Sequence, residues 1–116
     1  MKKIKTKSAT SGKNVWQYKT DGDVTVAVTI PADKAPKADE SGRKVLKAGT
    51  IYPEQGANAK GVLQYDVDLT DGDSENAALI VHGAVKEDVC KEATGADISA
   101  DTKKALPHIM WFMDEQ

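Results

Sequence analysis

Two runs of alternating residues constrain the fold of this chain most strongly. Residues 24–30 read VTVAVTI, and residues 62–69 read VLQYDVDL. A period of two residues is the pattern of a β-strand, since successive side chains point to opposite faces. In the second run, one face is apolar and the other carries most of the polar side chains, so one face is expected to be buried and the other to meet water. Its expected buried face holds Leu63, Tyr65, Val67 and Leu69.

The remaining patterns add strands and two short helices. Apolar runs at 45–53, 77–85 and 108–112 predict further strands. Val85, Val89 and Ala93 are spaced by four, with Gly95 as a stop, and predict a helix over 85–93. A second helix is expected over 99–106, capped by Ser99 or Asp101 and ended by Pro107. The predicted fold is mainly β with one or two short helices.

Charge divides the chain into two parts. Residues 1–20 hold six lysines and no acid, whereas the other 96 residues hold 10 basic and 18 acidic side chains. We therefore predict a flexible basic N-terminal arm over 1–20 and a single β-rich domain over 21–116. The arm contains a short apolar island, VWQY, at 15–18. Residues 31–44 contain two prolines and no large apolar side chain, and are expected to form a mobile loop.

The aspartate-rich stretch DVDLTDGD, at 66–73, raises the question of a cation site. An EF-hand loop needs a glycine at its sixth position and a glutamate at its twelfth. Loops that start at Asp66 or at Asp71 have neither. We interpret the stretch as a solvated hairpin tip, with Asp66 and Asp68 on the water-facing side of the strand.

The residues that most often carry catalysis are few. The chain has one cysteine, Cys90, and two histidines, His82 and His108. A thiolate–imidazole pair needs Cys90 beside a histidine, and structural zinc needs three or four ligands. There is no Gly-rich phosphate loop. We expect no enzyme activity, no cofactor and no metal, and we interpret Cys90 as a packing residue.

Other function classes are also disfavoured. No apolar run is long enough to span a bilayer, and the Lys-rich start lacks the apolar core of a signal peptide. With a single cysteine, a reducing compartment or a particle assembled in one is expected. The arm lacks interleaved aromatic residues and the body is acidic, so binding to nucleic acid is not expected.

Several segments together resemble a known family. They are VLKAGTIYP at 45–53, AKGVL at 59–63, ALIVHGAVKEDV at 78–89, TKKAL at 102–106 and the closing apolar strand. This order resembles the head decoration proteins of tailed bacteriophages, of the lambda-like type, and related head fibre proteins. The matching motif positions are Ala48, Gly49, Thr50, Gly61, Val62, Leu63, His82 and Gly83. Tyr52-Pro53 and the long loop 31–44 depart from the family pattern.

The resemblance implies a β-clip-like decoration-protein domain and a structural role in the virion. Members sit as homotrimers on the outer surface of the expanded capsid, where the N-terminal arm adds a strand to the major capsid protein. Before assembly, such a protein resides in the host cytoplasm. On this basis the capsid-binding residues are Lys2, Lys3, Ile4, Lys5, Thr6, Lys7, Val15, Trp16 and Tyr18.

Two alternatives from other classes remain open. A small β-rich module that binds a ligand or carbohydrate on a particle or cell surface would need an aromatic platform, and the chain has six aromatic residues. A nucleic-acid-associated protein would act through the basic arm.

Overall fold

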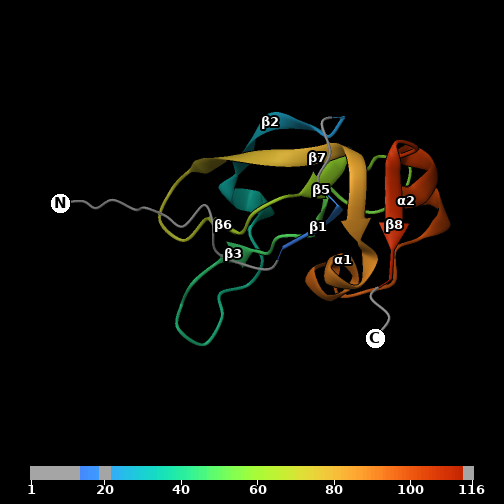
Figure 1. The fold of residues 1–116 in the computed structure, drawn as a ribbon. Helices are drawn as coiled ribbons and strands as arrows, with labels where there is room; N and C mark the ends of the chain where they lie inside the picture. The colour runs from blue at the N-terminus through green and yellow to red at the C-terminus, as the bar shows by residue number, and fades with distance from the viewer. Residues whose placement is uncertain (1–13, 19–21, 114–116) are drawn as a thin grey trace.

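The structure is a computed structural model, and it describes residues 14–18 and 22–113. The chain forms a small, mainly β domain with two short α-helices, as the sequence predicts (Figure 1). The strands are β1 (Trp16–Tyr18), β2 (Val24–Pro31), β3 (Val45–Leu46), β4 (Ile51–Tyr52), β5 (Gly61–Leu63), β6 (Val67–Asp68), β7 (Ser74–Lys86) and β8 (Ile109–Phe112). The helices are η1 (Ala32–Lys34, a 3₁₀ turn), α1 (Glu87–Thr94) and α2 (Ala100–Ala105).

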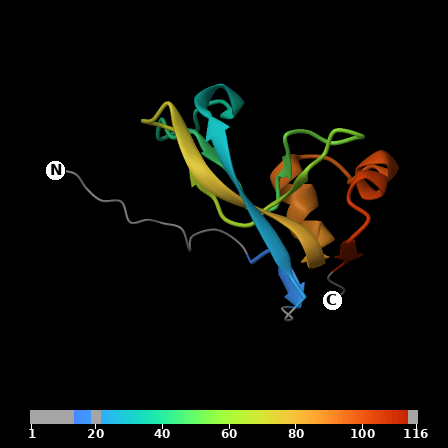
Figure 2. The ribbon, with the colours of Figure 1, turned by 90° about the horizontal axis from the view of Figure 1, so that it is seen from above.

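Strand β7 is the central strand of the main sheet, and four other strands pair with it. Its first part lies between β2 and β5, which both pair antiparallel with it at Leu79 and Ile80. Its last part lies between β1, which is antiparallel, and β8, which is parallel. Strand β4 extends the sheet beyond β5, while β3 and β6 form a separate two-stranded sheet. In Figure 2, β2 accompanies the first part of β7, with which it pairs.

The two faces of β7 bury two separate clusters of apolar side chains. Ile80 belongs to a larger cluster with Val62, Val85, Val89 and Ile109, while Leu79 packs with Ile30, Leu63, Val67 and Leu69. Neighbouring residues on a strand point to opposite faces, so Leu79 and Ile80 supply different clusters. Almost all of the buried side chains are aliphatic, as is expected for a chain with an aromatic content of 5%.

Both helices form close to where the sequence predicts them, but the first begins at Glu87, because Val85 and Lys86 still belong to β7. Gly95 ends α1 in the left-handed conformation, with φ of 86°, and its N–H donates to the Lys91 carbonyl oxygen. Of the two candidate caps for α2, Ser99 is the one used, because its side chain accepts a hydrogen bond from the Thr102 N–H. The helix ends at Ala105, just before Leu106 and Pro107.

The expectation of one continuous strand over 62–69 is wrong. Residues 61–63 form β5 in the main sheet, and 67–68 form β6 against β3. Because the chain leaves the main sheet between them, Val62 and Leu63 are both buried, whereas Tyr65 is exposed. The predicted strand over 45–53 is likewise divided into β3 and β4, at a turn that contains Gly49.

Residues 31–44 contain more structure than an irregular loop. Pro31 still belongs to β2, and η1 follows directly. Further on, the Asp39 carboxylate accepts hydrogen bonds from the backbone N–H groups of Ser41 and Arg43, which fixes a turn. The mobility of the segment remains a prediction.

Candidate functional site

The N-terminal segment enters the domain through a buried anchor at Val15 and Trp16. Both side chains are in the larger apolar cluster, with 1% and 7% of their surface exposed. The Lys86 N–H donates to the Val15 carbonyl oxygen over 2.7 Å, and β1 then pairs with β7. Asn14 stabilises this entry, because its side chain accepts from the Trp16 N–H and donates to the Trp16 carbonyl oxygen.

The anchor corrects the predicted arm. Val15 and Trp16 were expected to contact a capsid, but packing inside the domain already uses both side chains. The Tyr18 backbone pairs with Ala84 in β7. The boundary of the arm at residue 20 is therefore wrong, and the folded domain includes residues 14–18. The other predicted arm residues lie outside the described residues: Lys2, Lys3, Ile4, Lys5, Thr6 and Lys7.

Gly83 is the residue against which the anchor packs. It has a φ of 144°, and a Cβ atom placed there would lie 2.7 Å from Cζ3 of Trp16 and 2.8 Å from Oδ1 of Asp23. Both distances are too short for a real side chain. Glycine at this position therefore lets the Trp16 ring and the start of β2 approach β7 closely.

Of the other motif positions, His82 is exposed and Thr50 is half-buried, while the remaining five lie in the interior of the fold. The Gly49 N–H donates to the Leu63 carbonyl oxygen and the Leu63 N–H donates to the Thr50 carbonyl oxygen, so the segments 48–50 and 61–63 are bonded to each other. A Cβ atom on Gly49 would meet the backbone of Val89 and Cys90 in α1. On Gly61 it would lie 2.9 Å from the Ile80 carbonyl oxygen. Ala48 and Val62 are buried as well. The positions in 48–50 and 61–63 therefore connect β4, β5, β7 and α1.

The two histidines lie together on the surface. The rings of His82 and His108 are stacked, with centroids 5.5 Å apart and planes 19° apart, and both residues are exposed. The Gly83 N–H donates to the His108 carbonyl oxygen, which brings the start of β8 beside β7. The described residues contain no group of three or more His, Cys, Asp or Glu side chains placed to hold a metal ion.

Cys90 is a packing residue in the described fold. It is fully buried on α1 in the larger apolar cluster. Burial, with smaller contributions from the negative charges of Glu87 and Asp88, raises the pKa of its thiol to about 12. The thiol is therefore protonated at neutral pH, and the thiolate is the form that acts as a nucleophile.

The aspartates at 66 and 68 bind their own chain. The Asp66 carboxylate accepts from the Ala48 N–H over 2.8 Å, and Asp68 accepts from the Arg43 guanidinium over 2.6 Å and from the Thr70 N–H. They tie the stretch 43–48 to β6. The expectation that both carboxylates simply face water is wrong for Asp66, which is half-buried.

The environment of Asp68 makes stability depend on pH. Hydrogen bonds from Thr70, and then from Arg43, lower the pKa of its carboxyl group from 3.8 to about 2. The ionised form is therefore favoured by folding, and its contribution is present above about pH 4 and is lost as the pH falls through 2. Since the side chain is 44% exposed, we expect Asp68→Asn to lower the free energy of unfolding by at most about 1 kcal/mol at pH 7. Urea unfolding at pH 7, 4 and 2 should show the difference from the natural protein decreasing towards pH 2, where about half of the Asp68 carboxyl groups in the folded protein are protonated. Asp71→Asn, in the next turn, is the control, and a difference for Asp68→Asn that is as large at pH 2 as at pH 7 would contradict this account.

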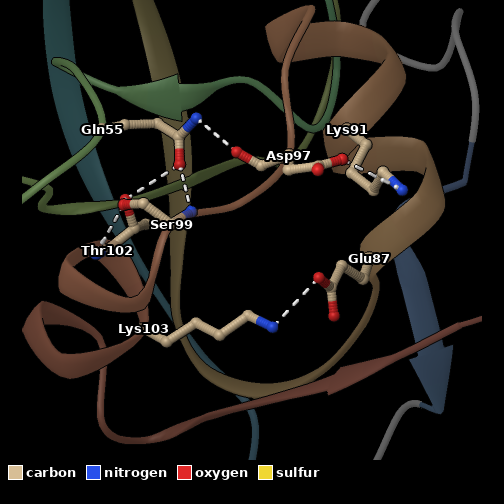
Figure 3. Close-up of polar contacts among 7 residues, drawn as sticks. All are labelled: Gln55, Glu87, Lys91, Asp97, Ser99, Thr102 and Lys103. Atoms are coloured by element: carbon tan, nitrogen blue, oxygen red, sulfur yellow. Dashed lines mark hydrogen bonds and ion pairs between the residues drawn. The ribbon is translucent and has the colours of Figure 1, made fainter.

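A polar cluster joins the loop after β4 to the start of α2 (Figure 3). Gln55 Oε1 accepts from the Ser99 N–H and from the Thr102 hydroxyl, and Gln55 Nε2 donates to the Asp97 carbonyl oxygen. Thr102 is fully buried and also accepts from the Gly56 N–H. The hydrogen-bond donors and acceptors of this cluster pair with one another. The cluster therefore has a structural role, which is to hold the loop after β4 against the start of α2. Sequence reasoning missed it because Gln55 and Thr102 are far apart in the chain.

Two ion pairs beside this cluster connect the helices to their surroundings. Lys103 of α2 lies 3.0 Å from the Glu87 carboxylate at the start of α1, and its ammonium group is 6.0 Å from the centre of the Trp111 ring. Lys91 pairs with Asp97 across the turn after α1. Trp111 packs against the larger apolar cluster, which leaves Tyr65 as the large exposed aromatic side chain among those the structure describes.

Comparison with family models, curated proteins and solved structures finds no match to this chain. Within the described residues, no helix is both long and apolar enough to cross a membrane.

Proposed function

We propose that this protein is a structural protein of a phage virion, which binds the outer surface of the expanded capsid as a homotrimer and stabilises it. The observation that carries the proposal is the resemblance of segments 45–53, 59–63, 78–89 and 102–106 to head decoration proteins. The partner is the major capsid protein, and the contact is made by the basic segment that precedes the buried anchor.

The glycines of the resemblance support the proposal, since Gly49, Gly61 and Gly83 all occupy sites where a side chain would clash. A motif made of common residues gains weight when its glycines are required by the packing of the fold. The spacing of these three positions thus reflects one arrangement of β4, β5 and β7.

The division of charge supports the choice of the N-terminal segment as the contact. Residues 1–13 hold five lysines and no acid, whereas the 103 residues from Asn14 onward hold 11 basic and 18 acidic side chains. An acidic capsid surface would therefore attract the segment and repel the domain. Val15 and Trp16 would hold the base of the segment in place while it adds a strand to the capsid protein.

The carbohydrate-binding alternative gains no support from the positions of the aromatic residues. A sugar platform needs flat rings on the surface, but Trp16 is buried and Trp111 packs against the interior. Tyr65 alone is a small platform for such a ligand.

The lysines of the N-terminal segment give a charge-matched test. We expect the fourfold variant Lys2→Gln, Lys3→Gln, Lys5→Gln and Lys7→Gln to bind expanded heads about tenfold more weakly or worse, since each exposed ion pair contributes up to about 1 kcal/mol. Its binding should also depend less on salt. The control removes four exposed lysines of the domain, at 34, 37, 44 and 60, and so has the same net charge. Equal weakening of both variants in a sedimentation assay would mean that net charge matters and the segment does not.

A further inference from the structure

Strand β2 has one edge without a partner strand in the described residues. Along its other edge it pairs with β7 from Val24, opposite His82, to Pro31, opposite Ser74. Among residues 14–18 and 22–113, no strand pairs with the outer edge. Figure 2 shows β2 as a long strand that lies over β7. An open edge offers a row of backbone N–H and C=O groups to another strand.

The composition of β2 makes this edge suited to pairing. Residues 24–30 contain no charged residue, no proline and no glycine. Val24 and Val26 are 45% and 41% exposed, and Thr25, Ala27 and Thr29 on the other face are exposed as well. Proteins usually protect open edges with lysine, proline or a bulge inside the strand. In β2, the proline (Pro31) and the one register shift (between Val24 and Thr25) both lie at the ends, and the residues between them have no such protection. A long uncharged edge of β-branched residues tends to pair with another chain.

The sequence of β2 is almost the same in both directions. Starting from Ala27, the residues on either side are Val26 and Val28, then Thr25 and Thr29, then Val24 and Ile30. If two copies of the strand lie antiparallel with Ala27 opposite Ala27, the first residue of each pair in one copy lies opposite the second residue of that pair in the other copy. Valine then meets valine and threonine meets threonine, which are favourable cross-strand pairs. Ile30 is already fully buried inside its own copy and adds no such contact.

We propose that β2 is a homotypic interface, in which it pairs antiparallel with β2 of a second copy about a two-fold axis at Ala27. The pairing joins two copies of the main sheet through the order β7–β2–β2–β7. On one face, it brings together the half-exposed valines of both copies. The threonines line the other face.

Charge does not oppose a second copy at this edge. The chain from Asn14 onward carries 18 acidic and 11 basic side chains, so two copies repel each other over much of their surface. The stretch 24–30 brings no charge to the contact. A two-fold contact also uses both open edges at once and is closed, so it does not continue into a fibre.

The proposal stands independently of the capsid role, and it adds to that role a contact between copies. Two strands of this length form an interface below about 1,200 Å², which is typical of weak complexes. Free protein is therefore expected to pair only at high concentration. On a surface that already holds many copies, the same weak contact is strengthened by the high local concentration.

Cysteine cross-linking tests the pairing and its register. Directly opposed residues of antiparallel strands have Cα atoms about 4.5–5.5 Å apart, within the range of a disulfide. We expect Ala27→Cys, treated with oxidised glutathione, to form a disulfide-linked dimer in high yield at about 1 mM protein. Cys90 is fully buried and does not compete. The control is Ala38→Cys, an exposed site away from β2, which should remain largely unlinked. Equal linkage of both variants, or linkage through Val26→Cys and not through Ala27→Cys, would overturn the proposal.

A second variant measures the pairing without cross-linking. Ala27→Lys places two like charges across the axis, while Ala27 itself is exposed, so the fold of one copy should be preserved. Sedimentation velocity at about 1 mM should show self-association of the natural protein that Ala27→Lys reduces at least tenfold. Ala38→Lys should leave it unchanged, and circular dichroism should show that both variants are folded. Self-association that is absent from the natural protein, or unaffected by Ala27→Lys, would rule out the interface.

Discussion

Replacing Gly83 by alanine is expected to lower the free energy of unfolding by about 3 kcal/mol or more. Two effects add. The φ of 144° is unfavourable for a residue with a side chain, and the new Cβ atom would lie 2.7 Å from the Trp16 ring. That ring is buried in the larger apolar cluster and has little room to move. Urea unfolding followed by tryptophan fluorescence measures the change.

Gly56→Ala separates the two effects. Gly56 also has a positive φ, of 105°, but a Cβ atom there would have no atom within 4 Å. Gly56→Ala should therefore lower the free energy of unfolding by only about 1 kcal/mol, which is the cost of the backbone strain. Similar losses at Gly56 and Gly83 would contradict the close approach of Trp16 to β7.

Truncating Leu79 is the second change with a large expected effect. Leu79 is fully buried at the centre of the smaller cluster, with Ile30, Leu63, Val67 and Leu69 around it. Leu79→Ala should lower the free energy of unfolding by about 2–5 kcal/mol, through lost burial and the cavity left behind. Small domains are stable by about 5–15 kcal/mol in total, so this is a large fraction.

The matched control for Leu79 is its neighbour across the sheet. Val26 lies opposite Leu79 in the register of β2 and β7 but is 41% exposed. At low protein concentration, Val26→Ala should lower the free energy of unfolding by less than about 1 kcal/mol. If the two substitutions are equally damaging in urea unfolding, the assignment of β2 to the edge of the smaller cluster is wrong.

Local patterns in the sequence were sufficient for elements that are stabilised locally. Val89, Ala93 and the stop at Gly95 correspond to α1, although Val85 belongs to β7, and the cap at Ser99 corresponds to α2. Alternation correctly indicated that 24–30 is a strand. It could not show that Val24 and Val26 are exposed, because that depends on whether another element covers them.

Long-range contacts explain where the sequence reasoning failed. The run 62–69 alternates like one strand, yet Asp66 bonds to the Ala48 backbone and 67–68 pair with β3. The apolar island VWQY was visible, but its partner Gly83 lies far along the chain. The boundary of the arm was therefore placed too late.

The corrected boundary changes how the central claim should be tested. A truncation of residues 1–20 would also remove Val15 and Trp16 from the interior, so a loss of binding could reflect a damaged domain. Removing residues 1–13 leaves the anchor and β1 in place. Circular dichroism and urea unfolding of this variant should match the full chain.

The most direct measurement is therefore co-sedimentation of the full chain and of the variant that lacks residues 1–13 with expanded, empty phage heads. The account predicts that the full chain saturates the heads at about one copy per capsid subunit, as many copies on a symmetric lattice would, while the folded variant stays in the supernatant. If the variant pellets equally well, the N-terminal segment is not the capsid contact. If neither protein pellets, the proposed role on the capsid is contradicted.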